Sequence, residues 1–249
     1  MAYDTNRFCW HGIHSTDVKG AIGFYTEVLG WSVVMQDMAD SEIAMFAAAD
    51  GAPRLHVARP PMEGMSSTWD NYLRVDDVDA TAAAVAEAGG LVVVPGTDIP
   101  PGRFAIVSSP SGATLALFKE AQPDTNSHPG GGAGSIHWVE LHSHDVAADV
   151  AWLKTVFGFE VMERPMGGQA YHLLTMNGEM RGGVVAAAGV DHPSMWVAWV
   201  VVDDVDACVH QATERGGKRL SDTSEMEGVG RMALVADPTG AVFGVITPS

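Results

Sequence analysis

The sequence predicts an α+β protein of two tandem domains, each with paired β-α-β-β-β modules forming a curved, partly closed sheet around a cleft. Three observations predict this fold. The chain repeats itself at about half its length, each copy carries strand and helix patterns in the same order, and a segment of linker composition separates the copies. Its 249 residues are enough for two domains of ordinary size.

The internal repeat appears when the sequence is shifted by 128 residues, or by 127 in the middle of each copy. The matching pairs include Trp10 and Trp138, His14 and His142, Asp17 and Asp145, Gly30 and Gly158, Trp69 and Trp196, and Gly102-Arg103 and Gly230-Arg231. RVDDVDA also matches VVDDVDA, and PSGA matches PTGA. So many matches in the same order indicate two copies of one domain.

The segment between the copies has the composition of a linker. AQPDTNSHPGGGAG is rich in Gly, Pro, Asp and Ser and has no apolar periodicity. We therefore predict a first domain at 1–120, a linker at 121–134 and a second domain at 135–249.

Within each copy, a strand, a helix and further strands follow one another twice. A strand at 8–15 precedes a helix that Asp17 caps, and Gly30 stands where a helix ends. Asp76 or Asp77 caps a second helix, which ends near Ala88. Strands are predicted at 32–57, 71–75, 91–94, 103–108 and 114–118, and the second copy has helices near 146–157 and 205–215.

The overall composition excludes several classes of function. A net charge of −17 repels phosphate backbones and anionic lipid surfaces, so we expect neither a nucleic-acid partner nor a membrane partner. No apolar run has the length of a membrane span, and the N-terminus lacks a secretory pattern. Cys9 and Cys208 form no metal motif and are typical of buried thiols in a reducing compartment. A cytoplasmic location is expected.

Two motifs resemble the opening module of a known superfamily. They read WHGIHSTD with FYTEVLGW in the first copy, and WVELHSHD with WLKTVFGF in the second. Together with the DDVDA helix start, the GR strand start and the PSGA and PTGA turns, they resemble the vicinal-oxygen-chelate superfamily of glyoxalases, bleomycin-resistance proteins and dioxygenases. The resemblance covers nearly all of the chain outside the linker. It implies the fold but not the reaction, because fold does not determine function.

The resemblance also implies where a metal would bind. The metal enzymes of this superfamily take ligands from the first strand, from the strand that opens the second module and from the last strand. These positions fall on Trp10, Asp70 and Ala116 in the first copy, and on Trp138, Val197 and Gly244 in the second. Only Asp70 can ligate a metal through its side chain. We therefore expect no cofactor at the standard site, although a divalent metal elsewhere stays possible.

Strand alternation selects the candidate catalytic residues. Alternate residues of a strand share a face, so Glu140 and His142 lie on the face of Trp138. A carboxylate beside an imidazole could serve as acid and base near neutral pH. The same pair could instead hold a metal with His172 as third ligand, or could simply be a satisfied polar pair.

Further residues are candidates for ligand binding. Aromatic rings of Trp10, Tyr72, Trp138 and Trp199 could line the clefts or pack in the core. His14 and Asp70 would face the first cleft. Arg103 and Arg231 follow a glycine at the start of a strand, where each could clamp a ligand carboxylate or bond an acidic side chain.

Three functions remain open from the sequence. The first is a small-molecule-binding protein for a flat or aromatic organic ligand without the standard metal site. The second is a glyoxalase-like lyase or a dioxygenase-type enzyme, either metal-dependent or using Glu140 and His142. The third is a non-catalytic interaction protein. Two fused domains can pair with each other within one chain, as single-domain relatives pair by forming dimers, so we expect a monomer or a homodimer.

Overall fold

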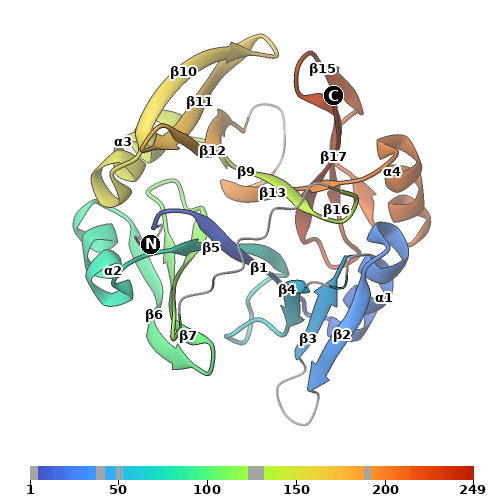
Figure 1. Ribbon diagram of the computed structural model, residues 1–249, viewed down its shortest axis with the longest axis horizontal. Helices are drawn as coiled ribbons and strands as arrows, with labels where there is room; N and C mark the ends of the chain where they lie inside the picture. The colour runs from blue at the N-terminus through green and yellow to red at the C-terminus, as the bar shows by residue number, and fades with distance from the viewer. Residues whose placement is uncertain (1–4, 38–42, 49–50, 52, 123–131, 188–191) are drawn as a thin grey trace. The chain divides into compact units, whose positions relative to one another are not determined.

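The structure is a computed structural model that describes residues 5–37, 43–48, 51, 53–122, 132–187 and 192–249 (Figure 1). Most of the predicted linker, at 123–131, lies outside the described residues. The division into domains at 1–120 and 135–249 stays a prediction.

Each repeat forms two β-α-β-β-β modules. The first repeat consists of β1 (Phe8–His14), α1 (Val18–Leu29), β2 (Ser32–Asp37), β3 (Ile43–Ala47), β4 (Pro53–Ala58), β5 (Thr68–Arg74), α2 (Val78–Glu87), β6 (Leu91–Ile99), β7 (Gly102–Ser108) and β8 (Thr114–Glu120). The second consists of β9 (Ile136–Ser143), α3 (Val146–Phe157), β10 (Glu160–Met166), β11 (Gln169–Met176), β12 (Glu179–Ala186), β13 (Met195–Val201), α4 (Val205–Glu214), β14 (Lys218–Arg219), β15 (Ser224–Met226), β16 (Gly230–Ala236) and β17 (Val242–Pro248).

The strands form two sheets that follow the two repeats. The first has the order β2-β3-β4-β1-β5-β8-β7-β6, and the second has the order β10-β11-β12-β9-β13-β17-β16-β14, with β15 beside β16. Within each module the first and last strands pair in parallel, as β1 does with β4 and β9 with β12. The other strands pair antiparallel. The predicted α+β class with paired modules is confirmed.

Each of the four helices in the described part of the chain begins at an aspartate whose carboxylate accepts a hydrogen bond from the backbone N–H three residues later. These caps are Asp17, Asp77, Asp145 and Asp204. The bonds satisfy backbone donors that a helix N-terminus leaves unpaired. Of the two caps considered for α2, the structure selects Asp77.

Two compact units each combine modules from both repeats. Unit 1 consists of residues 1–10, 71–127 and 139–196, and unit 2 of residues 11–70, 128–138 and 197–249. In unit 1, α2 packs against α3, and in unit 2, α1 packs against α4 (Figure 1). Each unit therefore holds one module of each sequence repeat.

The core of unit 2 is rich in aromatic rings. Tyr25 is fully buried, donates a hydrogen bond to Asp237 Oδ2 at 3.0 Å and accepts one from Trp69 Nε1 at 2.9 Å. Burial raises the pKa of Tyr25 well above its ordinary value, and the Asp237 charge adds to this. The phenol therefore stays protonated and ties helix α1 to the turn before β17.

Unit 1 joins its two modules through a buried carboxylate. Asp149 in α3 is fully buried and accepts hydrogen bonds from the hydroxyls of Ser143, at 2.6 Å, and Ser111, at 2.5 Å. These bonds compensate for the loss of water around the charge.

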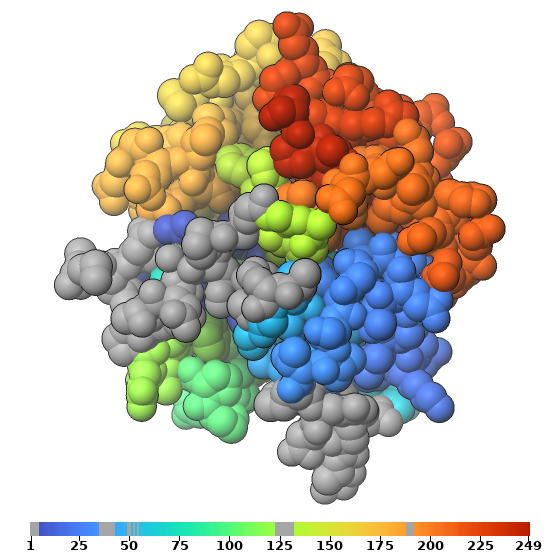
Figure 2. Space-filling view, turned by 45° about the vertical axis from the view of Figure 1, so that its right-hand side comes forward, coloured from blue at the N-terminus to red at the C-terminus, as the bar shows by residue number. Residues whose placement is uncertain are grey.

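The residues at the beginning of β9 reach the protein surface, where they appear in yellow-green in Figure 2. His137 is exposed there.

Among the described residues, no helix is long and apolar enough to cross a membrane.

Candidate functional site

In unit 1, β9 presents a carboxylate and an imidazole on one face. Glu140 Oε1 and His142 Nε2 lie 2.8 Å apart, which is a hydrogen-bond distance. The two side chains retain 12% and 9% of their exposure, so the bond is shielded from bulk water. Shielding strengthens the electrostatic coupling between the two groups.

Tyr171 holds the second oxygen of this carboxylate. Its hydroxyl donates to Glu140 Oε2 at 3.0 Å from strand β11. Gly183 pairs with Glu140 across β12 and β9, and a Cβ at Gly183 would lie only 1.9 Å from the Tyr171 hydroxyl oxygen. The glycine therefore provides the space through which the phenol reaches Glu140. Tyr171 was not among the residues that the sequence singled out.

His192 lies near His142, and His144 lies near His192. The His192 ring centroid is 5.8 Å from that of His142, and His144 Nε2 donates to the His192 carbonyl oxygen at 2.7 Å. Desolvation lowers the pKa of His192. A hydrogen bond to the Pro193 carbonyl oxygen opposes this shift, and electrostatic repulsion by His142 and His144 lowers the pKa further. His192 is therefore neutral near pH 7.

His172, the third ligand considered for a metal with Glu140 and His142, lies next to Tyr171 on β11. Neighbouring residues of a strand point to opposite faces, so His172 points away from the face on which Tyr171 meets Glu140. Among the residues that the structure describes, no group of three or more His, Cys, Asp and Glu side chains could hold a metal ion.

In unit 2, the first repeat has its own imidazole and carboxylate in contact. His14 Nδ1 meets Asp70 Oδ2 in a close ion-pair contact, and both side chains are more than nine-tenths buried. His14 occupies the position of His142 in the repeat, but its carboxylate comes from β5 rather than from its own strand. The two repeats thus build similar pairs in different ways.

His56 fills the space that the glutamate occupies in the second repeat. It pairs with Gly12 across β4 and β1, and a Cβ at Gly12 would lie 2.6 Å from its ring. The residue as a whole is half-buried, and its imidazole is strongly desolvated. Desolvation, with a smaller contribution from His14, lowers the pKa of His56 from 6.5 to about 3.

This lowered pKa predicts a loss of stability in mild acid. The unfolded chain binds a proton at His56 below its ordinary pKa of 6.5, whereas the folded chain resists protonation down to about pH 3. The His56 contribution is therefore complete above pH 6.5 and lost as pH falls toward 3. Between pH 7 and 5 we expect the wild type to lose about 1–2 kcal/mol more than His56→Gln.

Urea unfolding at the two pH values measures this difference. The control is His210→Gln, which replaces a histidine whose side chain is 70% exposed on α4 and which should keep the wild-type pH dependence. Equal pH dependence in the wild type and in His56→Gln would contradict the prediction.

Aromatic rings occupy the predicted ligand-lining positions. In unit 1, Tyr72 meets Phe118 edge-on, with 6.0 Å between ring centroids, and Trp10 packs against the same cluster, which includes Ala116. In unit 2, the indole of Trp199 covers Gly244, where a Cβ would lie 2.2 Å from the ring. Trp138 is partly buried on β9.

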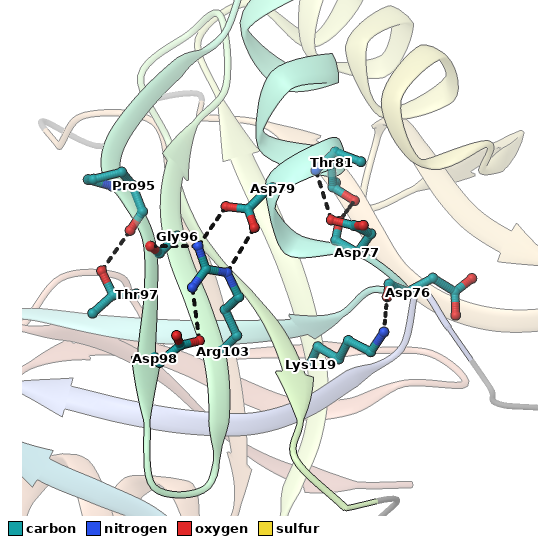
Figure 3. A network of polar contacts seen from close by, with 11 residues as sticks. Asp76, Asp77, Asp79, Thr81, Pro95, Gly96, Thr97, Asp98, Arg103 and Lys119 are labelled. Atoms are coloured by element: carbon teal, nitrogen blue, oxygen red, sulfur yellow. Dashed lines mark hydrogen bonds and ion pairs between the residues drawn. The ribbon is translucent and has the colours of Figure 1, made fainter.

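Both candidate arginines are bonded to carboxylates. Arg103 donates to both oxygens of Asp79 and to Asp98, each at 2.9 Å, and to the Gly96 carbonyl oxygen (Figure 3). The Arg103 hydrogen bonds lower the pKa of Asp79. Arg231 donates to Asp206 at 2.8 Å in the equivalent place of unit 2. Of the two roles considered for these arginines, the structure shows bonds to acidic side chains, and the clamping of a ligand carboxylate stays a prediction.

Family models match both repeats. Residues 11–118 match the Glyoxalase-like domain, and residues 135–245 match the Glyoxalase/Bleomycin resistance protein/Dioxygenase superfamily. The chain belongs to this superfamily. The resemblance seen in the motifs of the sequence is thereby confirmed.

Two relatives match nearly the whole length of the chain. CFP32 of Mycobacterium tuberculosis (strain CDC 1551 / Oshkosh), whose name carries the word glyoxylase, is 30% identical over 96% of this chain and 94% of its own length. The anthracycline biosynthesis protein DnrV of Streptomyces peucetius is 28% identical over 95% of this chain and 91% of its own.

Solved structures share the fold at low identity. The Mn(II)-bound glyoxalase from Novosphingobium aromaticivorans is 21% identical, with a TM-score of 0.61 over 98% of this chain and 82% of that one. The 2,2',3-trihydroxybiphenyl 1,2-dioxygenase from Sphingomonas wittichii strain RW1 is 16% identical, with a TM-score of 0.65 over 98% and 91%.

The residues at the positions that the resemblance assigns to metal ligands do not fit a three-ligand centre. In the second repeat, Trp138, Val197 and Gly244 offer no side-chain ligand, and the Trp199 ring occupies the space at Gly244. In the first repeat, Asp70 is engaged by His14, and Ala116 lies in an apolar cluster. Zinc, manganese and iron sites need several imidazole, carboxylate or thiolate ligands.

Proposed function

We propose that this chain is a small-molecule-binding protein of the superfamily that takes a flat or aromatic organic ligand without a metal at the standard positions. The observation that carries the proposal is that five of the six positions that the resemblance assigns to metal ligands hold residues whose side chains cannot ligate a metal, Asp70 being the exception. Trp10, Tyr72 and Phe118 gather around Ala116 in unit 1, and Trp199 covers Gly244 in unit 2. Aromatic faces suit flat organic rings.

The name of DnrV directs the choice of the first ligand class. That relative is an anthracycline biosynthesis protein. A fused-ring aromatic molecule is therefore the first probe, and the anthracycline daunorubicin has a fluorescence that reports its binding. Its cationic group also suits a chain of net charge −17.

Fluorescence titration at physiological salt tests the proposal. We expect saturable binding that EDTA leaves unchanged, and Trp10→Leu should weaken it about tenfold, because losing one stacking ring costs about 1.4 kcal/mol. The control is Leu91→Gln, which changes a residue 67% exposed on β6. Absence of saturable binding across daunorubicin and other fused-ring probes would refute the ligand class, and binding abolished by EDTA would refute the metal-free part.

A second candidate function is an acid/base enzyme of the same superfamily. The hydrogen bond between Glu140 and His142 favours it, because a shielded carboxylate–imidazole pair is suited to proton transfer. The cytoplasmic location and the monomeric or homodimeric state stay predictions from the sequence.

A further inference from the structure

We propose that the second repeat contains a proton-transfer site in which His142 Nδ1 is the base and Glu140 and Tyr171 are positioning residues. The site would take a small organic ligand that carries a weakly acidic O–H or C–H group. Proton transfer goes beyond the ligand binding proposed above. The proposal makes Glu140 a positioning residue rather than a base, and it adds Tyr171 to the site, a residue that no sequence pattern singled out.

The hydrogen bond to Glu140 selects the tautomer of His142. An ionised carboxylate only accepts hydrogen bonds, so the 2.8 Å contact places a proton on His142 Nε2. A neutral imidazole with a proton on Nε2 has its lone pair on Nδ1. Within the described part of the chain, Nδ1 has no hydrogen-bond partner. The lone pair that can accept a proton is therefore not engaged by a described residue.

Glu140 itself is less suited to be the base. One oxygen accepts from His142 and the other accepts from the Tyr171 hydroxyl at 3.0 Å. The two bonds hold the carboxylate in one orientation, with 12% of the side chain exposed. A carboxylate fixed in this way orients the imidazole and stabilises the positive charge that the ring gains with a proton.

Gly183 is the reason that Tyr171 can take part. Any side chain at this position would meet the phenol hydroxyl, because even a Cβ would lie 1.9 Å from it. In the first repeat the corresponding residue of the parallel pair is His56, which faces Gly12. In the first repeat the glycine lies on the first strand and the ionisable residue on the fourth, whereas in the second repeat the glutamate lies on the first strand and the glycine on the fourth. Of the two first strands, only that of the second repeat has a glutamate two residues before its histidine.

The groups around His142 are compatible with a neutral base. Glu140 bonds it from β9, Tyr171 of β11 bonds the same carboxylate, and the His192 ring lies 5.8 Å from it, with His144 beside His192. His192 has a lowered pKa and so adds no positive charge near pH 7.

The proton step balances without a further reactant. The lone pair of Nδ1 takes the proton, the O–H or C–H bond of the ligand breaks, and its electron pair stays on the ligand as an oxyanion or a carbanion. The imidazolium then lies beside the Glu140 carboxylate. Return of the proton to the ligand, at the same or another atom, restores the neutral ring.

The first repeat provides an internal reference for the experiment. His14 meets its carboxylate through Nδ1 rather than Nε2, so we expect the opposite tautomer, with the lone pair on Nε2. Long-range ¹H–¹⁵N NMR spectra of the unmodified protein near pH 8 distinguish the two forms. An Nδ1–H tautomer at His142 would overturn the proposal, and no ligand or variant is needed to see it.

Chemical modification tests the positioning residues. Diethyl pyrocarbonate acylates an unprotonated imidazole nitrogen, and mass spectrometry of the His142 peptide gives the rate. Glu140→Gln should slow the reaction about tenfold, because a charge-assisted hydrogen bond is lost. Tyr171→Phe should slow it about threefold, because one neutral donor to the carboxylate is lost.

The control variant is His137→Gln, which changes an exposed histidine of the same strand and should leave the His142 rate unchanged. Circular dichroism establishes that each variant is folded. Rates in Glu140→Gln and Tyr171→Phe equal to the wild-type rate would refute the positioning roles. Because none of these measurements uses a ligand, their failure is separate from a failure to bind daunorubicin.

Discussion

Replacing Trp31 with alanine is expected to lower the free energy of unfolding by about 3–5 kcal/mol, the usual range for removing a large buried aromatic side chain. Trp31 follows α1 and is 1% exposed. Its ring stacks on Tyr25, with 6.0 Å between centroids, and lies 5.6 Å from Phe46. Alanine would leave a cavity in the core of unit 2 that rigid neighbouring rings cannot fill.

The indole of Trp31 also makes a polar contact with the chain that precedes the second repeat. Its Nε1 donates to the Gly134 carbonyl oxygen at 2.9 Å. Trp31→Phe keeps most of the ring but loses this donor, so it should cost only about 1–2 kcal/mol. The second repeat has a phenylalanine at the position that matches Trp31, namely Phe159, which is buried in unit 1.

Urea unfolding followed by both fluorescence and circular dichroism gives the two free energies and tests whether unfolding is two-state. A loss below about 1 kcal/mol for Trp31→Ala would mean that the core of unit 2 can collapse around the missing ring.

The second large effect is expected at Gly230, where alanine should cost about 3 kcal/mol or more. Gly230 begins β16 with a φ of 129°, which side chains rarely adopt. A Cβ there would lie 2.2 Å from the Thr247 carbonyl oxygen and 2.8 Å from the Pro248 Cα. Both are backbone atoms of the paired strand β17, so relief of the clash requires the sheet to distort.

Gly23 offers a matched control of opposite sign. It lies inside α1, and apart from its chain neighbours and the backbone of its own helix no atom lies within 4 Å of a Cβ built on it. Alanine has the higher helix propensity, so Gly23→Ala should stabilise the protein by about 0.5–1 kcal/mol. Thermal unfolding of both variants checks the pair, and a shift of the same sign in both would contradict the assignment.

The sequence predicted those parts of the fold that depend on local patterns. An aspartate before a helix caps it through its side-chain carboxylate, which accepts a hydrogen bond from the backbone N–H three residues later, so the caps at Asp17, Asp145 and Asp204 can be read from neighbouring residues. The repeat predicted the order of the elements, because both copies must bury the same faces.

The sequence could not predict contacts that depend on the register between distant strands. Tyr171 meets Glu140 only because β12 places Gly183 beside Glu140, and no local pattern specifies that pairing. His56 and Gly12 are a similar case. A glycine within an otherwise apolar strand was the available signal, because it often marks the close approach of another group.

The composition of the two compact units has a consequence for a severed chain. Unit 1 needs residues 71–127 and 139–196, and unit 2 needs residues 11–70 and 197–249. A protease that cuts between the repeats would leave neither fragment with all the segments of either unit. The halves should therefore reconstitute as a heterodimer whose melting temperature rises with protein concentration. In the intact chain, the connecting segment keeps the two halves at a high effective concentration, so that their association does not depend on protein concentration.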